Sequence, residues 1–290
     1  MSKLSPRHRG ILFILLSSFC FACMNVCVRM AGDVPTIQKS FFRNLVALVV
    51  AVSVLVREKQ GIRPADRKNI PMLLARAFFG TVGVLANFYA VDHLMLSDAS
   101  MLNKMSPFFA VLASSFLLKE KITPMQMLTL AGAFLGAMFI VRPSFSNMDL
   151  IPSLIGLSGG ICAGIAYTYV RKLGLHGEKG PVIVFAFSAF SCLTALPFIL
   201  FHYSPMTMTQ LLWLLGAGVA ATGGQFSITA AYCNAPAREI SVYDYSQVIF
   251  SAFLGFVLFA DIPDAYSVVG YVLICGMAIV NFRYNNRKKA

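Results

Sequence analysis

The feature that most constrains this chain is a series of ten apolar segments of about 20 residues, joined by short polar connections. Only 12% of its 290 residues are charged and 58% are hydrophobic, whereas a soluble domain carries about 25% charged and about 45–50% apolar residues. So few charges cannot cover a globular surface. The sequence therefore predicts an all-α polytopic membrane protein with ten transmembrane helices, at residues 10–29, 34–56, 69–91, 95–118, 122–141, 151–170, 181–202, 208–231, 238–260 and 264–282.

Lysines and arginines are distributed unevenly between the two sets of segment ends. One set holds Lys3, Arg7, Arg9, Arg57, Lys59, Arg63, Arg67, Lys68, Lys119, Lys121, Arg171, Lys172, Lys179, Arg238, Arg283, Arg287, Lys288 and Lys289. The opposite set holds only Arg29 and Arg142. Because positive residues stay on the cytoplasmic side of short loops, we expect a cell (plasma or inner) membrane protein with both termini cytoplasmic. The net charge of +12 then reflects topology, and nucleic acid is not an expected partner.

An internal repeat divides the chain into two halves, 1–146 and 147–290. A shift of 140 residues places "FLLKEKITPMQMLTLAGAFLGAMFIV" over "FVLFADIPDAYSVVGYVLICGMAIV", and it pairs Gly83 with Gly223. Each half holds five spans, an odd number, so the second half must enter the membrane from the opposite face. Such inverted repeats are typical of secondary carriers, which bind their substrate near the midplane between the repeats.

The same segments carry a resemblance to a known family. "LSDASMLNKMSPFFAVLASSFLLKEKITPMQ", followed by the glycine-rich "LAGAFLGAMFIVRP", is similar to the half-repeat of EamA-type members of the drug/metabolite transporter superfamily. "FFRN" and "RAFFG" resemble the branch that includes organic-anion carriers and an S-adenosylmethionine carrier. In the second half, "FADIPD" replaces the "KEK"-type turn. The resemblance covers essentially the whole chain and implies a transporter whose substrate it does not specify.

Ionisable side chains inside spans are costly and usually face a cavity or one another. Here they are Lys39, Arg43, Arg76 and Lys104 in the first half and Glu239 and Asp244 in the second. The 140-residue shift places Lys104 on Asp244, so the two halves should bring these residues to one cavity. Pro107 clashes with the Asn103 carbonyl one turn earlier. A freed carbonyl is tolerated at membrane depth only where it faces protein or water, which predicts a wet pocket at Asn103 and Lys104.

We expect the substrate to be bound by polar side chains of the spans, namely Asn25, Lys39, Arg43, Asn87, Asn103, Lys104, Tyr167, Tyr243, Asp244 and Gln247. Lys39 and Arg43 share a helix face because they are four residues apart, and the aligned part of the seventh span has no charge. The structural alternatives are a Lys104–Asp244 pair that only neutralises itself and an Arg43 bonded to helix carbonyls. For Arg76 we expect a structural role, with its charge reaching the cytoplasmic surface.

These residues predict a secondary-active carrier of small polar metabolites, most simply carboxylate-bearing ones such as amino acids or organic anions. One alternative is a carrier of cationic or zwitterionic solutes such as S-adenosylmethionine or choline-like amines, held by Asp244, Glu239 and tyrosine rings. A channel is the non-carrier alternative. We expect no catalytic residue, metal site or cofactor. A proton or a counter-substrate would drive transport, and the protein would be a monomer or a homodimer.

The predicted topology can be tested by cysteine labelling. In a background lacking the seven native cysteines, a cysteine at Asn286 should react with an impermeant maleimide only after the membrane is permeabilised. Labelling of Asn286→Cys in intact cells would contradict the topology.

Overall fold

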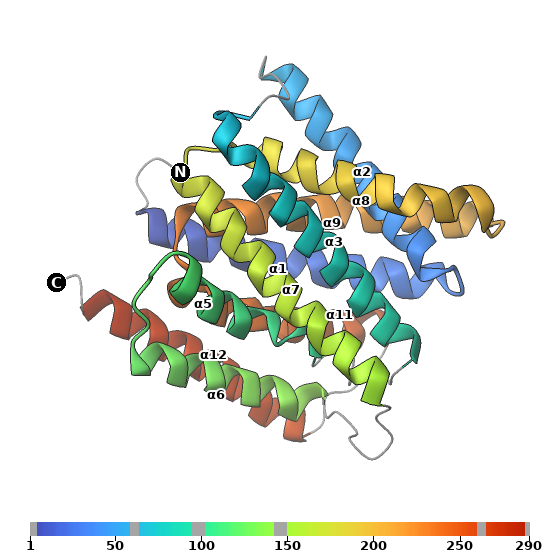
Figure 1. Ribbon diagram of the computed structural model, residues 1–290. Coiled ribbons are helices and arrows are strands. Elements are labelled where there is room, and N and C mark those ends of the chain that lie inside the picture. Colours follow the sequence, from blue (N-terminus) through green and yellow to red (C-terminus); the bar gives the residue numbers. More distant parts are fainter. Residues whose placement is uncertain (1–4, 59–63, 94–101, 142–149, 260–264, 288–290) are drawn as a thin grey trace.

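The computed structural model describes residues 5–58, 64–93, 102–141, 150–259 and 265–287, and every regular element among them is helical. The start of the predicted fourth span (95–101), Arg142 and the boundary at 146–147 lie outside the described residues. The helices are α1 (Pro6–Ala31), α2 (Thr36–Arg57), η1 (Arg67–Asn69), α3 (Ile70–His93), α5 (Ser106–Leu117), α6 (Pro124–Val141), α7 (Leu150–Leu175), α8 (Gly180–Phe201), α9 (Met208–Asn234), α10 (Ala237–Ile240), η3 (Ser241–Tyr245), α11 (Ser246–Phe259) and α12 (Ala265–Arg287) (Figure 1).

The helices have the length and the surface of membrane spans. Within the described ranges, eight helical segments are long and apolar enough to cross a bilayer, and Ser106–Leu117 and Pro124–Phe139 are shorter apolar helices. Large apolar side chains point outward, among them Phe116 and Leu193, which are 83% and 68% exposed. Such a surface is stable only against lipid. The predicted all-α, ten-helix membrane fold is confirmed.

The helices pack in a pattern that has two-fold symmetry. The most extensive contacts join α1 to α9 and α3 to α7, that is, the first span to the eighth and the third to the sixth. Exchanging the two halves converts one pair into the other. In the same way α5–α7 corresponds to α1–α11, and α2–α9 to α3–α8, while α2–α8 and α6–α12 each join a helix to its own counterpart. The main contacts therefore run between the halves, as expected for two repeats around a shared axis.

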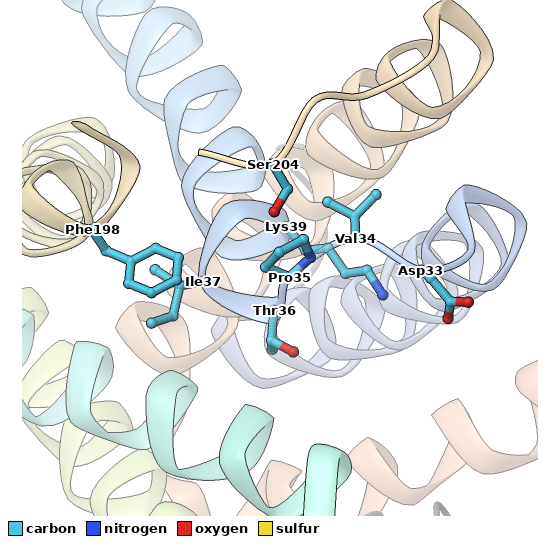
Figure 2. A pocket seen from close by; sticks show the side chains of 8 residues that line it. All are labelled: Asp33, Val34, Pro35, Thr36, Ile37, Lys39, Phe198 and Ser204. Atoms are coloured by element: carbon cyan, nitrogen blue, oxygen red, sulfur yellow. The ribbon is translucent and has the colours of Figure 1, made fainter. Parts of the chain in front are cut away.

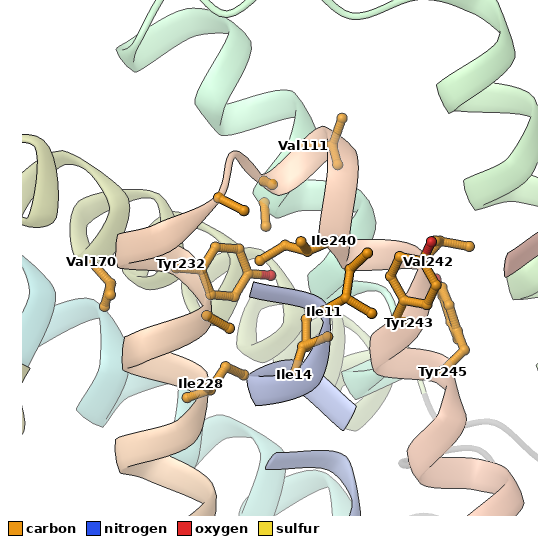
Figure 3. Packing of buried hydrophobic residues seen from close by; sticks show 14 of the residues in the cluster. Ile11, Ile14, Val111, Val170, Ile228, Tyr232, Ile240, Val242, Tyr243 and Tyr245 are labelled. Atoms are coloured by element: carbon orange, nitrogen blue, oxygen red, sulfur yellow. The ribbon is translucent and has the colours of Figure 1, made fainter. Parts of the chain in front are cut away.

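Both chain ends lie at one end of the bundle, which we call the termini end, and the opposite end is called the far end (Figure 1). Arg7 near the start of α1 donates a hydrogen bond of 2.7 Å to Asn286 near the end of α12. Near the termini end, apolar residues of α1 pack against the ninth span. Ile11 and Ile14 of α1 lie against the segment that carries Ile240 and Tyr245 (Figure 3).

Two spans that the sequence analysis takes as continuous helices are broken. In the fourth span, Leu102 and Asn103 are helical, Lys104 and Met105 form a turn, and α5 begins only at Ser106, with Pro107 in its first turn. The ninth span consists of α10, the 3₁₀ segment η3 and α11. Pro107 explains the first break because it cannot donate to the preceding turn. The second break has no proline, and a 3₁₀ stretch inside a helix often marks a functional hinge. The breaks lie 140 residues apart, at equivalent positions of the two halves.

Glycines on α7 allow the broken fourth span to approach closely. A Cβ atom at Gly160 would lie 2.6 Å from the Leu102 carbonyl oxygen, and one at Gly164 would lie 2.7 Å from the Ala110 nitrogen. Small residues let membrane helices pack backbone to backbone. The α7 hydroxyl of Thr168 also donates to the Ala110 carbonyl at 3.2 Å. These contacts fix the position of the chain on both sides of Lys104.

We expect Gly164→Ala to lower the melting temperature, because overpacking a tight contact typically destabilises by about 1–3 kcal/mol. Gly276→Ala is the matched control, since a Cβ there meets no atom within 4 Å and alanine favours the helix. Thermal unfolding of both variants in detergent tests this expectation. Equal melting temperatures for the two variants would show that the α5–α7 contact is not tight.

Candidate functional site

The two broken spans meet at an ion pair. Nζ of Lys104 lies 3.5 Å from Oδ2 of Asp244 and donates a hydrogen bond of 2.7 Å to Oε1 of Gln247. The side chains of Lys104 and Asp244 are only 11% and 8% exposed. The two halves thus bring Lys104 and Asp244 into contact, as the 140-residue shift predicts, and a substrate cavity at this place stays a prediction. The pair joins the fourth span of the first half to the ninth span of the second.

Side chains bind the backbone carbonyls near the breaks. The Tyr245 hydroxyl donates to the Lys104 carbonyl at 3.1 Å, and the Ser18 hydroxyl donates to the Asp244 carbonyl at 3.5 Å. The sequence predicts a freed carbonyl at Asn103, whereas the hydroxyl of Tyr245 binds the carbonyl of the next residue, Lys104. Asn103 is half-buried beside the break. The irregular backbone is tolerated here because protein groups satisfy it.

Stacked tyrosines from α7 and α9 lie beside the ion pair. The ring centroids of Tyr167 and Tyr232 are 5.1 Å apart, with an interplanar angle of 10°. The Tyr232 hydroxyl shares a hydrogen bond of 3.2 Å with Ser241 at the start of η3. Ser241 and Asp244 belong to the same five-residue segment, η3. The tyrosine pair therefore extends the polar region from the ion pair to α7 and α9.

Two arginines from the first half complete this region. The Arg43 guanidinium of α2 lies 5.9 Å from the centroid of the Phe21 ring, and that of Arg76 on α3 lies 4.3 Å from the Phe187 ring. The two helices that carry these arginines, α2 and α3, contact each other. Within the described ranges, neither guanidinium has an ion-pair partner. The expectation that Arg76 reaches the surface is wrong, because it is 2% exposed and stacks on an aromatic ring inside the bundle.

Lys39 lies apart from this cluster, at the far end. It lines an open pocket of about 610 Å³ with Asp33, Val34, Pro35, Thr36, Ile37, Phe198 and Ser204 (Figure 2). The pocket lies where the α1–α2 turn meets the chain after α8. Gln38 stabilises this junction by donating to the Ser204 carbonyl at 2.9 Å. Lys39 is therefore one helical turn from Arg43, but its side chain lines this pocket at the far end.

The remaining candidates lie in three different places. Asn25 is exposed on α1, seven residues after Ser18 and thus on the same helix face, toward the far end. Asn87 is half-buried on α3, where a Cβ atom at Gly159 of α7 would lie 3.1 Å from its backbone nitrogen. The Tyr243 hydroxyl donates to the Ala278 carbonyl of α12 at 3.3 Å. Tyr243 thus points toward α12, whereas Tyr245 points to the break.

Ion pairs between the two halves close the termini end. Nε of Arg7 lies 3.5 Å from Oε2 of Glu239, and Nε of Arg171 lies 3.7 Å from Oε1 of Glu120. Each pair joins one residue from each half. Glu239 is therefore held at this end and lies outside the cluster around Lys104.

Three contributors to the site are not among the predicted substrate-binding residues, namely Tyr232, Tyr245 and Arg76. A signal for Tyr245 was available, because it follows Asp244 directly in the polar "SVYDYSQ". Arg76 and Tyr232 lie near the ends of predicted spans, and residue position alone does not distinguish a buried side chain there from one at the interface. Within the described part of the chain, no group of three or more His, Cys, Asp or Glu side chains could hold a metal ion.

Comparison with known proteins agrees with this architecture. The model of the EamA-like transporter family matches residues 8–142 and again 150–283. The chain is 33% identical over 267 residues to the pseudopaline exporter CntI of Pseudomonas aeruginosa, covering 91% of this chain and 93% of that protein. It is 27% identical to a riboflavin transporter of Brucella anthropi, covering 92% and 95%. A crystal structure that is 16% identical superimposes with a TM-score of 0.83, covering 97% of this chain and 99% of the other, and shows the same fold. This chain therefore belongs to the EamA-like transporter family.

Proposed function

We propose that this protein is a secondary-active carrier of small carboxylate-bearing metabolites, with its site between two inverted halves. One observation carries the proposal: two equivalent broken spans face each other across Lys104 and Asp244. Discontinuous spans whose free backbone groups line a site at the repeat interface are typical of secondary carriers. In this proposal the protein lies in the cell membrane with both termini cytoplasmic.

The balance of charge favours an anionic substrate. Arg43 and Arg76 have no carboxylate within ion-pair distance in the described part of the chain, and Asp244 is already paired with Lys104. Glu239, the second acid of a cation-binding alternative, is paired with Arg7 at the termini end. Guanidinium groups bind carboxylates through two parallel hydrogen bonds. The arrangement thus supports a carboxylate-bearing solute more than an amine.

Alternating access requires contacts that one conformation makes and another releases. The pairs Arg7–Glu239 and Arg171–Glu120 are suitable, because each joins the two halves at the termini end. The far end holds the open pocket beside Lys39. We infer that this conformation has the site closed toward the termini and that a state open on that side would break these pairs. Two relatives, a pseudopaline exporter and a riboflavin transporter, support movement of a small molecule.

We expect Lys104→Met to destabilise the empty protein more than Asp244→Asn. Breaking a buried pair on one side costs about 3–5 kcal/mol in soluble proteins. Lys104 keeps the Gln247 oxygen when Asp244 is neutralised, whereas Asp244 loses its charged partner when Lys104 is replaced. The double variant should recover stability but not substrate binding. Melting temperatures and ligand affinities of the singles and the double measure this coupling.

The exposed Lys68→Met is the control for loss of a lysine and should unfold like the native protein. If the double variant also regains transport, Lys104 does not contact the substrate. If its melting temperature stays as low as that of Lys104→Met, the two side chains do not act as a pair.

The proposed activity can be tested in proteoliposomes loaded with an equimolar mixture of amino acids, organic acids and amines. Mass spectrometry should show faster loss of carboxylate-bearing solutes, accelerated by the same solute outside, which distinguishes a carrier from a channel. Arg43→Ala should abolish this loss without lowering the melting temperature, because Arg43 makes no hydrogen bond or ion pair within the described ranges. Arg43→Lys keeps the charge and should retain part of the activity. Selective loss of amines alone would contradict the proposal.

A further inference from the structure

We infer that Arg76 is a second cation of the substrate site and that, with Arg43, it selects substrates carrying two negative charges, as two carboxylates or as a phosphate ester. The inference rests on the proposed function and deepens it. Neither the family match nor the relatives' names assign a role to Arg76 or a charge to the solute.

The surroundings of Arg76 hold its guanidinium at one place inside the bundle. The side chain is 2% exposed, and the guanidinium stacks 4.3 Å from the centroid of Phe187 on α8. A Cβ atom at Gly80, one turn later on α3, would collide with Nη1 of Arg76 and would lie 2.9 Å from the Phe187 ring. Gly80 therefore leaves the space that the guanidinium occupies. A site that is built around a charged group in this way fixes its position against both halves.

The charge of Arg76 is not compensated by the protein groups around it. Its Nε is fully buried and has no hydrogen-bond partner, and within the described ranges no carboxylate lies at ion-pair distance. Burial of an ion is strongly unfavourable unless a partner of opposite charge and hydrogen bonds offset it. A single aromatic face is a weaker partner than a carboxylate. A structural arginine would be expected to bind helix carbonyls, and the described atoms include no such bond.

Arg43 places a second uncompensated cation nearby. Arg43 lies on α2, which contacts α3, the helix that carries Arg76, and its guanidinium lies 5.9 Å from the centroid of the Phe21 ring. Around the site, Arg43, Arg76 and Lys104 contribute three positive charges, and Asp244 contributes one negative charge. The excess is therefore two positive charges. A ligand with two negative charges would neutralise this excess and would receive the forked hydrogen bonds that guanidinium groups offer.

The experiment compares solutes that differ by one negative charge in otherwise similar molecules. Proteoliposomes are loaded with succinate and succinamate, with N-acetylglutamate and N-acetylglutamine, and with glycerol 3-phosphate and its methyl phosphodiester, which carries one negative charge less. For the native protein we expect efflux of the dianions to exceed that of their partners about ten- to hundredfold, the effect of one charge-assisted contact. Comparing the dicarboxylate pairs with the phosphate pair shows whether the site prefers two carboxylates or a phosphate ester. Preference for the monoanions, or no preference, would overturn the inference.

Two variants assign the preference to Arg76. Arg76→Gln should reduce dianion efflux to the level of the monoanions while leaving monoanion efflux measurable. Gly80→Ala retains the charge but displaces the guanidinium, so it should reduce the same preference. Gly276→Ala, on open space in α12, should behave like the native protein.

If both site variants keep the native preference, Arg76 does not contact the anion, although the proposed carrier of carboxylates still stands. If the native protein moves no carboxylate at all, the proposed function itself fails.

Discussion

The constraint on which the rest of this structure depends is that a charge inside a bilayer must be matched by a partner or by water. Lys104 satisfies it with Asp244 and Gln247, which belong to the other half of the chain. To reach them, Lys104 must sit at a break in its span. That break exposes a backbone carbonyl, which Tyr245 then binds. Pro107 breaks the fourth span, and the buried ammonium at that break accounts for the juxtaposition of the two spans and for the polar residues of the ninth span.

The helix packing brings the two breaks together without extra elements. Because the first span packs on the eighth and the third on the sixth, the fourth and ninth spans face each other across the centre. The glycines of α7, Gly160 and Gly164 among them, allow backbone contact on one side of the break. At the termini end, the halves are joined by the ion pairs of Arg7 and Arg171. In an alternating-access cycle, opening this end would require both pairs to separate, and the water that enters there would replace their contacts.

The sequence predicted much of the fold, because bilayer thickness and hydropathy determine where spans lie. It also predicted the Lys104–Asp244 contact, since a repeat of constant offset relates residues that share an axis. It did not predict the 3₁₀ segment of the ninth span, because no proline or glycine marks it and the break depends on tertiary contacts such as the one between Ser18 and Asp244. The burial of Arg76 was missed for a similar reason. The ring of Phe187 and the space beside Gly80 come from packing that periodicity does not encode.

In the proposed carrier, uncompensated cations also influence which states the empty protein can adopt. Two guanidinium groups that lack an anion are least unfavourable when water reaches them, so an empty site resists complete closure. A ligand can shift a conformational equilibrium only by its difference in affinity for the two states. An anion that removes the repulsion between Arg43 and Arg76 provides such a difference, because its contacts strengthen as water leaves. The same two residues would then select the solute and couple its binding to closure. A site with fully paired charges could hold the fold together but would lack this coupling.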